Sequence, residues 1–407
     1  IRRSGKSYLL NTLFYRHLIA ENISEDHIIK FAFDSAEDLL KIGEDPIVLD
    51  NEKEDRKVDP SKFINRLMPQ IKGDGMYYLL LDEVQKLGAF ESVLNGFLRR
   101  ENLDVYVTGS NSKFLSKDIL TEFRGRGDEV HVLPLSFSEY YTFKQGDKSE
   151  AYDDYSVYGG LPAVALMVTE EQKTNYLISQ MQNLYLRDIV NRYAVQDETA
   201  LGKVIDVIAS GISTLTNPRK IANTMHTIHG TKTCDATVDR YIGYAEEAFI
   251  LTRVKRYNVK GRKYIGTPYK IYFEDAGLRN ARLSFRQIEG THMMENIIYN
   301  ELRYRGYQVD VGTVVSREKD SSGKEIRVQR EIDFIASLGS KKYYIQSAYA
   351  IPDQEKYEQE TKSFEHTMDS FKKVIIVEKS MKSRYDEHGY LMMGVKEFLL
   401  DANSLLI

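Results

Sequence analysis

Two short polar motifs in the first quarter of the sequence carry the residue types that phosphate chemistry needs. Gly5-Lys6-Ser7 stands directly before a run of helix-forming residues that begins at Tyr8. Backbone N–H groups of such a loop and helix start can bind phosphate oxygens, the lysine can reach the β- and γ-phosphates, and the hydroxyl can bind Mg²⁺. Asp82 and Glu83 end an apolar run. The first would hold the Mg²⁺ shell through water, and the second would polarise an attacking water.

Neither motif is specific by itself. A Gly-Lys-Ser tripeptide occurs by chance at many helix starts, and an acidic pair at a strand end is often only solvated. Their separation suits alternating strands and helices, and the combination favours the functional interpretation. The full loop pattern, G-x-x-x-x-G-K-[ST], needs a glycine one position before Ile1. We therefore expect the phosphate loop and the strand that feeds it to be incomplete in this sequence.

The elements around these motifs are predicted to be alternating strands and helices. Four apolar runs are candidates for strands, and the continuous one before Asp82 is typical of a strand buried on both faces of a parallel sheet. The runs lie at Ile28–Phe33, Met76–Glu83, Leu103–Asn111 and Glu129–Leu133. Strand ends of such a sheet meet at the nucleotide. Asn111, or Ser110 beside it, could therefore contact the γ-phosphate or the lytic water, with a plain turn as an equal alternative.

Arg126 is a candidate arginine finger. It lies in the run Arg124-Gly125-Arg126-Gly127, shortly before the fourth expected strand. A planar guanidinium can neutralise the charge that develops on a transferred phosphoryl group. If this arginine acts on a neighbouring subunit, the protein must form a homo-oligomer.

The ordered set of motifs resembles a large family of prokaryotic AAA-type ATPases, in which a domain of unknown function follows the ATPase core. The resemblance implies ATP and Mg²⁺ as cofactors and covers essentially the whole chain. The matching segments are Arg2–Ser7, Leu80–Gln85, Val107–Ser112, Arg124–Arg126, Leu133–Tyr140 and Tyr158–Pro162. The site residues that it implies are Arg3, Ser4, Gly5, Lys6, Ser7 and Tyr8 for the nucleotide, Ser7 and Asp82 for the metal, and Glu83, Asn111 and Arg126 for catalysis.

Four domains of an α/β protein are expected. Residues 1–147 would form the AAA-type P-loop ATPase core, a parallel sheet whose first strand is missing from this chain, and residues 148–196 a helical lid. Residues 197–287 are typical of a winged helix-turn-helix. Their expected helices lie at Leu201–Gly211, Asn217–Met225 and Cys234–Ile242, and the strands of the wing at Phe249–Tyr257 and Tyr269–Phe273.

The expected wing is strongly basic. This charge favours double-stranded DNA as a partner. Asp235 and Asp239 on the third helix would repel phosphate, and winged helices also bind proteins, so a protein client is the alternative partner. The basic residues are Arg253, Lys255, Arg256, Lys260, Arg262, Lys263 and Lys270.

Residues 288–407 resemble a degenerate restriction-endonuclease-like α/β domain. Glu295 and Asp333 match two carboxylate positions of that core, but the third motif reads Gln346-Ser347-Ala348 in place of Glu-x-Lys. Without this carboxylate a metal site loses a charged ligand, and without the lysine the attacking water loses its partner. We expect no nuclease activity.

The composition limits the kinds of partner and the cellular compartment that we expect. The net charge is −4, with 42% hydrophobic and 29% charged residues, so a nucleic-acid contact needs a local patch. The single cysteine, Cys234, excludes an intrachain disulfide and fits a reducing, cytoplasmic compartment. No apolar run is long enough to span a bilayer.

The expected function is Mg²⁺-dependent ATP hydrolysis that controls an appended DNA- or protein-binding module. The alternative is a non-hydrolysing DNA-binding protein that uses the basic wing at residues 253–270.

Overall fold

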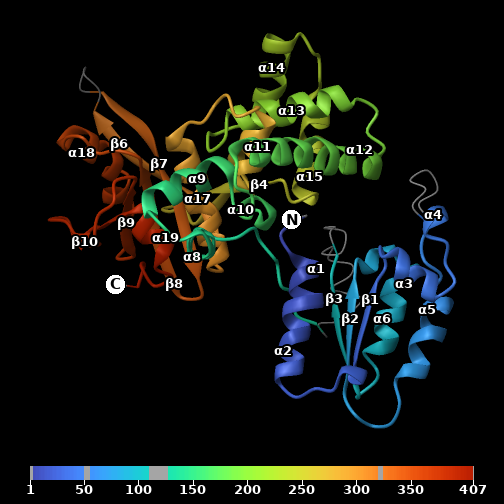
Figure 1. Cartoon of the computed structure of the whole chain (residues 1–407). Helices are drawn as coiled ribbons and strands as arrows, with labels where there is room; N and C mark the ends of the chain where they lie inside the picture. Colours follow the sequence, from blue (N-terminus) through green and yellow to red (C-terminus); the bar gives the residue numbers. More distant parts are fainter. Residues whose placement is uncertain (1–2, 50–55, 110–126, 320–323, 407) are drawn as a thin grey trace. The chain divides into compact units, whose positions relative to one another are not determined.

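The computed structural model describes residues 3–49, 56–109, 127–319 and 324–406 (Figure 1). The chain forms two compact units, residues 1–132 and residues 133–407, which we call the first unit and the second unit. Separate clusters of buried apolar side chains fill them. Each unit is therefore described by itself.

The first unit is built on a parallel three-stranded sheet. Its strands are β1 (Ile28–Ala32), β2 (Tyr77–Asp82) and β3 (Leu103–Val107), in the order β1-β2-β3. β2 lies in the middle, and its leucines at positions 79–81 are fully buried. The expectation of a parallel sheet with a doubly covered central strand is confirmed.

Helices cover both faces of this sheet, which explains why the central strand is continuously apolar. Leu79 and Leu81 pack with side chains of α3, α5 and α6, whereas Leu80 packs with Leu10 and Leu18 of the first helical segment. The helices are α1 (Lys6–Tyr8), the π-helical segment η1 (Leu9–Phe14), α2 (Tyr15–Ala20), α3 (Ala36–Lys41), α4 (Pro46–Leu49), α5 (Pro60–Leu67) and α6 (Phe90–Phe97), with 3-10 turns η2 (Glu25–His27), η3 (Met68–Gln70) and η4 (Val84–Lys86).

The strand expected at Glu129–Leu133 is wrong. The segment has no regular structure, and the side chain of Val130 is 78% exposed. A strand is held by hydrogen bonds to a neighbouring strand, and none of the described strands pairs with this segment. An alternating apolar pattern without a neighbouring strand was therefore not enough to predict a strand here.

The second unit begins with helices. The three helices expected between residues 201 and 242 are present as α13 to α15, and residues 170–193 form a helical run with a π-helical segment in its middle. The bounds are α8 (Phe137–Lys144), α9 (Lys148–Tyr158), α10 (Pro162–Ala165), α11 (Glu170–Ser179), η6 (Gln180–Leu186), α12 (Arg187–Tyr193), α13 (Glu198–Ser210), α14 (Pro218–His229) and α15 (Asp235–Glu247).

An eight-stranded mixed sheet follows, in the order β10-β11-β9-β8-β7-β6-β4-β5. The strands are β4 (Leu251–Asn258), β5 (Lys263–Phe273), β6 (Gln308–Lys319), β7 (Glu325–Leu338), β8 (Lys341–Ala348), β9 (Lys372–Val377), β10 (Arg384–Tyr385) and β11 (Leu391–Gly394). The helices between and after them are α16 (Ala276–Arg282), α17 (Gly290–Tyr304), α18 (Gln354–Thr361), η7 (Phe364–His366) and α19 (Val395–Leu400).

The strand pair expected to form a wing belongs to this same sheet. β4 pairs with β5 on one side and runs parallel to β6 on the other, with Arg256 opposite Val311 and Asn258 opposite Thr313. The domain boundary that we expect after residue 287 therefore falls between strands of one continuous sheet.

Helices pack on both faces of the large sheet as well. On one face, α17 and α19 bury Ile298 and Phe398 against Phe334 of β7. On the other, Phe364 of η7 packs against Tyr344 of β8. Within the described ranges, no helix has the length and apolar character to cross a membrane.

Candidate functional site

The loop at the start of the first unit adopts a helix-initiating conformation. Gly5 has φ 95° and ψ 13°, a left-handed conformation that glycine adopts without strain, and it precedes the first turn of α1. Its carbonyl accepts a hydrogen bond from the N–H of Leu9 at 2.8 Å. Lys6 and Ser7 thus lie in the first helical turn, where N–H groups lack intrahelical acceptors and can bind an anion.

The residues on either side of this turn differ in their exposure to solvent. Arg3 and Tyr8 are exposed, so both are accessible to a ligand. Ser4 is buried, and its hydroxyl donates to the carbonyl of Val132 at 3.0 Å. This contact gives Ser4 a structural task in shaping the loop.

Asp82 is the point at which three segments of the first unit meet. Its carboxylate is 4% exposed. It accepts one hydrogen bond from Asn11 Nδ2, at 3.3 Å, and another from the Thr108 hydroxyl. Asn11 belongs to the helical segment that follows the loop, and Thr108 follows β3. The carboxylate is therefore oriented by the first helical segment and by the segment that follows β3.

Glu83 follows with a left-handed backbone, φ 53°. Its N–H donates to the Thr108 hydroxyl at 3.2 Å, and its carboxylate accepts from Gln85. Asp34, which follows β1, lies within electrostatic reach. Burial raises the pKa of Asp34, the charge of Glu83 raises it further, Lys86 opposes this, and Asp82 adds to it. Asp34 therefore feels the charges of both carboxylates that end β2.

This arrangement fits a magnesium nucleotide. Mg²⁺ is commonly bound by one or two protein oxygens together with phosphates and waters, so a cage of many protein ligands is not required. The two expected ligands, Ser7 and Asp82, are a hydroxyl and an oriented carboxylate, which are oxygen donors of the kind that Mg²⁺ prefers. Among the residues that the structure describes, no group of three or more His, Cys, Asp or Glu side chains forms a ready metal cage.

Some of the predicted residues cannot be placed. Ser110, Asn111 and Arg126 lie outside the described residues, so their roles stay predictions. The structure adds Asn11, Thr108 and Asp34, which the sequence analysis did not assign to the site. A polar residue directly after a buried strand was an available signal for Thr108 and Asp34.

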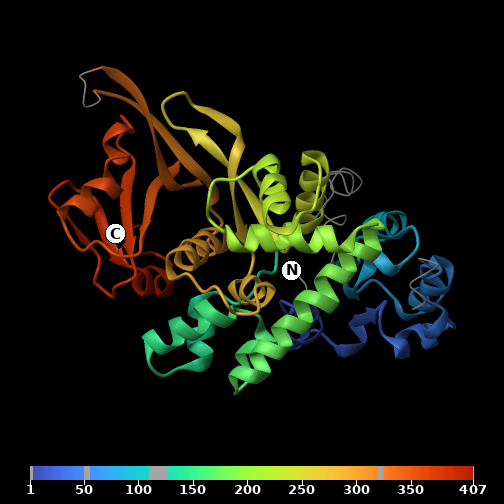
Figure 2. The same cartoon turned by 90° about the horizontal axis from the view of Figure 1, so that it is seen from above.

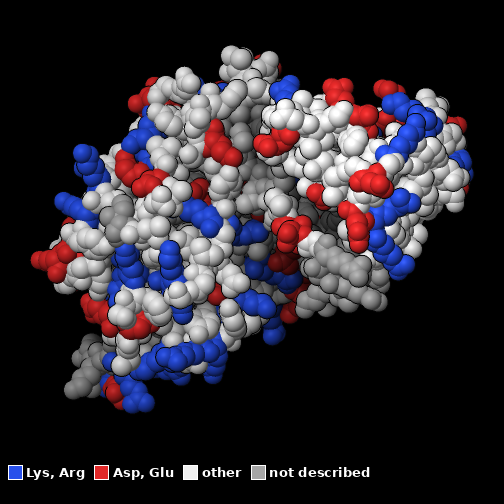
Figure 3. Space-filling model, turned by 90° about the horizontal axis from the view of Figure 1, so that it is seen from below, with Lys and Arg blue, Asp and Glu red and all other residues white. Residues whose placement is uncertain are grey.

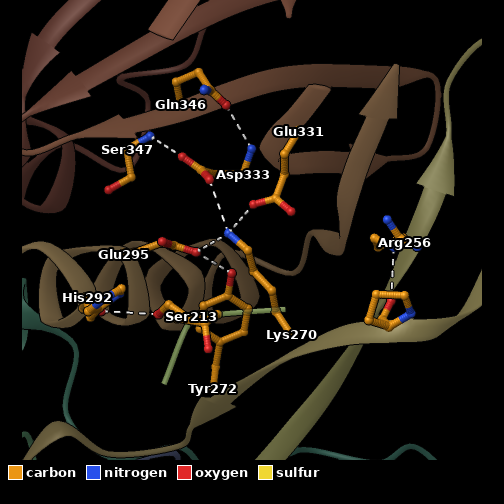
Figure 4. A network of polar contacts seen from close by, with 12 residues as sticks. Ser213, Arg256, Lys270, Tyr272, His292, Glu295, Glu331, Asp333, Gln346 and Ser347 are labelled. Carbon is orange, nitrogen blue, oxygen red and sulfur yellow. Dashed lines mark hydrogen bonds and ion pairs between the residues drawn. The ribbon is translucent and has the colours of Figure 1, made fainter. Parts of the chain in front are cut away.

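A second polar cluster is buried in the second unit, and we call it the Lys270 cluster (Figure 4). Lys270 on β5 is 3% exposed. Its Nζ lies 2.8 Å from Glu295 Oε1, 2.7 Å from Glu331 Oε1 and 3.2 Å from Asp333 Oδ1. Tyr272, two residues further along β5, donates its hydroxyl to Glu295 Oε1 at 2.6 Å.

The three motifs of the expected degenerate domain do meet at this cluster. Glu295 comes from α17 and Asp333 from β7, and the Gln346-Ser347 pair on β8 closes the group. Asp333 Oδ2 accepts a hydrogen bond from the N–H of Ser347 at 3.0 Å, and the N–H of Asp333 donates to Gln346 Oε1 at 2.8 Å. An ammonium group therefore lies among the carboxylates.

The electrostatics of the cluster follow from burial. Burial raises the pKa of Glu295 to about 7, and the ammonium of Lys270 opposes this rise. For Lys270 itself, burial works to lower the pKa, but the charges of Glu295, Tyr272, Asp333 and Glu331 hold it well above its ordinary value. Lys270 is therefore the resident cation of the cluster.

The basic wing needs a correction. Lys270 is buried in the cluster just described, and Arg256 is 7% exposed and donates to the carbonyl of Pro268 at 2.9 Å. Arg253 forms ion pairs with Asp239 and Glu246, both at 2.6 Å. The residues of the set that remain exposed are Lys255, Lys260, Arg262 and Lys263. Counting charge along the sequence overestimated the surface available to phosphate.

Comparison with known proteins yields two family models. The model of an AAA domain matches residues 1–141, and that of a domain of unknown function (DUF8612) matches residues 149–289. An uncharacterized protein of Haemophilus influenzae is 32% identical over 386 residues, covering 93% of this chain and 88% of that protein. The uncharacterized protein MJ1544 of Methanocaldococcus jannaschii is 25% identical over 391 residues, covering 91% of this chain and 78% of that protein.

Two solved structures are distantly similar to this chain. The Walker-type ATPase PABY2304 of Pyrococcus abyssi superposes with a TM-score of 0.44 at 14% identity, covering 70% of this chain and 89% of that chain. The Orc1 protein of Aeropyrum pernix, solved in complex with DNA, gives a TM-score of 0.25 at 12% identity, covering 69% of this chain and 83% of that chain.

Proposed function

Because this chain belongs to a family of prokaryotic AAA-type ATPases, we propose that it hydrolyses ATP with Mg²⁺ at the Gly5-Lys6-Ser7 loop. The nucleotide state then controls the second unit. The observation that carries this proposal is the carboxylate of Asp82, which Asn11 and Thr108 hold at the carboxyl end of β2. Such a fixed carboxylate beside a phosphate-binding loop suits Mg²⁺.

Each residue of the site has a separate task. The N–H groups of the first turn hold phosphate oxygens, and Lys6 adds a positive charge. Ser7 and Asp82 hold Mg²⁺, which supplies charge neutralisation at the phosphates. Glu83 orients and polarises the attacking water. Arg126 and Asn111 are assigned to stabilising the transferred phosphoryl group.

The test compares ATP turnover of the full-length protein with that of Lys6→Ala and Glu83→Gln. Both variants should lose about 10²-fold or more, because one removes phosphate charge and the other the group that polarises water. Glu83→Gln should still bind ATP, whereas Lys6→Ala should bind it weakly. Glu101→Gln, an exposed carboxylate after α6, is the matched control and should turn over normally. Equal turnover in all four proteins contradicts the proposal.

The second unit is assigned to the partner, with residues 148–196 as a lid, 197–287 as a winged helix and 288–407 as a degenerate nuclease-like domain. The exposed Lys255, Lys260, Arg262 and Lys263 favour double-stranded DNA over a protein client. A homo-oligomer follows if Arg126 acts on a neighbour, and mass measurement with and without ATP tests this. A cytoplasmic location agrees with the single cysteine.

A non-hydrolysing DNA-binding protein is the second candidate, and the same exposed basic residues favour it. It predicts DNA binding whose affinity is the same with and without ATP and the same in Glu83→Gln. The ATPase proposal predicts that DNA affinity differs between the ATP-bound and nucleotide-free states. Measuring duplex affinity in both states separates the two candidates.

A further inference from the structure

Two β-hairpins of the second unit lie side by side (Figure 2). The first is β4–β5, which turns between Asn258 and Lys263, and the second is the longer β6–β7. β4 runs parallel to β6, and the N–H of Val259 donates to the carbonyl of Thr313 at 3.0 Å. The end of the first hairpin is thereby fixed against the second.

An open groove of about 710 Å³ lies between the hairpins and the segment around η7, from which Glu365, His366 and Met368 line it, and we call it the hairpin groove. Lys260 lines it from the first hairpin, and Arg317 and Arg327 line it from the second. Arg262 and Lys263 are exposed beside Lys260 at the same turn. Figure 3 shows Lys and Arg side chains gathered over the ends of these hairpins, along the lower left edge of the face seen from below.

The two arginines of the groove face each other. Arg317 on β6 is directly opposite Arg327 on β7 in the antiparallel register, so both side chains leave the same face of the ribbon. Like charges directly opposite each other destabilise an antiparallel pair. An anion bound between them removes this repulsion.

The acidic residues near the groove leave it positive. Glu325 Oε2 lies 3.8 Å from Arg317 Nη1, and both side chains are more than half exposed, so this ion pair is weak. Glu365 also lines the groove. Against these carboxylates stand Lys260, Arg317 and Arg327 in the lining, with Arg262 and Lys263 at the adjoining turn.

We propose that the hairpin groove binds the phosphodiester backbone of double-stranded DNA. The proposal rests on DNA as the partner of the second unit and names the surface that contacts it. A polyanion that extends past the groove satisfies the facing arginines and the basic turn together, which a single small anion cannot do. A two-stranded ribbon also fits the major groove of B-form DNA, whereas the major groove of an RNA duplex is too narrow for side chains to read.

This surface differs from the basic wing expected from the sequence. The proposed DNA contact lies at the turn Lys260–Lys263 and not along the strands of the wing, because Arg253 and Lys270 form ion pairs within the protein. It also gains Arg317 and Arg327 from a hairpin that the sequence analysis did not connect with the wing.

The test measures binding of the full-length protein to a fluorescent DNA duplex of about 20 base pairs by anisotropy, from about 50 to 200 mM salt. Arg317→Glu should weaken binding at least about tenfold and flatten the salt dependence by about one unit of slope per lost phosphate contact. It also places a carboxylate opposite Arg327, so the variant should unfold no earlier than wild type. The double change Lys260→Glu and Arg262→Glu should weaken binding similarly.

Lys341→Glu is the matched control, because this exposed lysine is the first residue of β8, directly after the β7–β8 turn and at the other end of β7 from the groove. It should bind DNA as wild type does. Wild-type affinity and salt slope in Arg317→Glu overturn the proposal, and so does tighter binding to an RNA duplex of the same sequence. ATP turnover without DNA should be normal in Arg317→Glu, so failure here is distinguishable from failure of the ATPase assignment, which Lys6→Ala tests.

Discussion

A single lysine determines the character of the Lys270 cluster. Three carboxylates within 3.2 Å of one ammonium carry more negative charge than it can neutralise. Tyr272, Ser347 and Gln346 therefore supply hydrogen bonds that help to satisfy the buried polar groups. The ammonium also gives a physical reason for the expected lack of nuclease activity, because it lies among the carboxylates that a catalytic metal would need.

Lys270→Met should destabilise the second unit by about 3 to 5 kcal/mol, since it leaves buried carboxylates without their cation. The free energy of unfolding in urea measures this loss. Adding Glu295→Gln to Lys270→Met should recover part of it, because one negative charge is removed. A Lys270→Met protein as stable as wild type would show that the ion pairs contribute nothing.

The titration of Glu295 should appear in the pH dependence of stability. Its pKa in the folded protein, about 7, exceeds its ordinary value of 4.5, so the folded state holds the proton more tightly than the unfolded state. Stability contributed by this group is therefore lost as pH rises from about 4.5 to about 7, and it changes little above that. Lys270 and Asp333 are its charged neighbours.

Glu295→Gln cannot titrate, so its melting temperature should fall less than that of wild type between pH 5 and pH 7. Melting curves of both proteins across this range make the comparison. Parallel curves would mean that Glu295 is ionised throughout.

At the residue scale the sequence located the loop and the acidic pair but not their partners. Asp82 was recognised because it ends an apolar strand. Its contacts, Asn11 and Thr108, come from segments far apart in the chain, and no local pattern joins them. Lys270 was counted as surface charge, although it stands within the apolar run Tyr269–Phe273. A lysine in such a run is rarely buried unless it is paired, and that was the available signal.

At the scale of elements, α16 is held against the end of α9 by close backbone contacts. Asp275 caps α16 and accepts a hydrogen bond from the N–H of Gly160 at 2.8 Å. A Cβ on Gly277 would lie 2.1 Å from the carbonyl oxygen of Tyr158, and one on Gly160 would lie 2.2 Å from that of Leu135. These two glycines allow the contacts that join α9, α16 and the start of the second unit.

Gly277→Ala should therefore destabilise the second unit by about 1 to 3 kcal/mol, because the clash is with backbone and cannot be relieved by a side-chain rotation. Gly243→Ala on α15 is the control. A Cβ there meets no atom within 4 Å, so the alanine should stabilise the helix by up to about 1 kcal/mol. Urea unfolding of both variants distinguishes them, and equal effects would refute the role of the close contact.

Elements with strong local patterns were predicted well, and their long-range pairing was not. The helices α13 to α15 and the strands β1 to β3 lie close to their expected positions. The parallel pairing of β4 with β6 joins residues about fifty positions apart, and no pattern within either strand indicates this pairing. For the same reason the long antiparallel pairing of β6 with β7, from Gln308 to Lys319, was not predicted.

At the scale of the whole molecule, two separate cores imply two unfolding events. The first unit and the second unit each bury their own apolar clusters. We expect two calorimetric transitions. Mg²⁺-ATP should raise the one that belongs to the first unit, by an amount set by ligand concentration and affinity. Lys270→Met should lower only the other. A single transition that responds to both changes would contradict this division.

The cation of the Lys270 cluster is a side chain of the protein itself, so its presence does not depend on the concentration of free metal ions. A covalently attached ammonium cannot dissociate on dilution, and a chelator cannot remove it. The carboxylates around it therefore keep this compensating positive charge when free divalent ions are scarce. In the proposed ATPase, a fall in Mg²⁺ would silence the nucleotide chemistry of the first unit and leave the fold of the second intact.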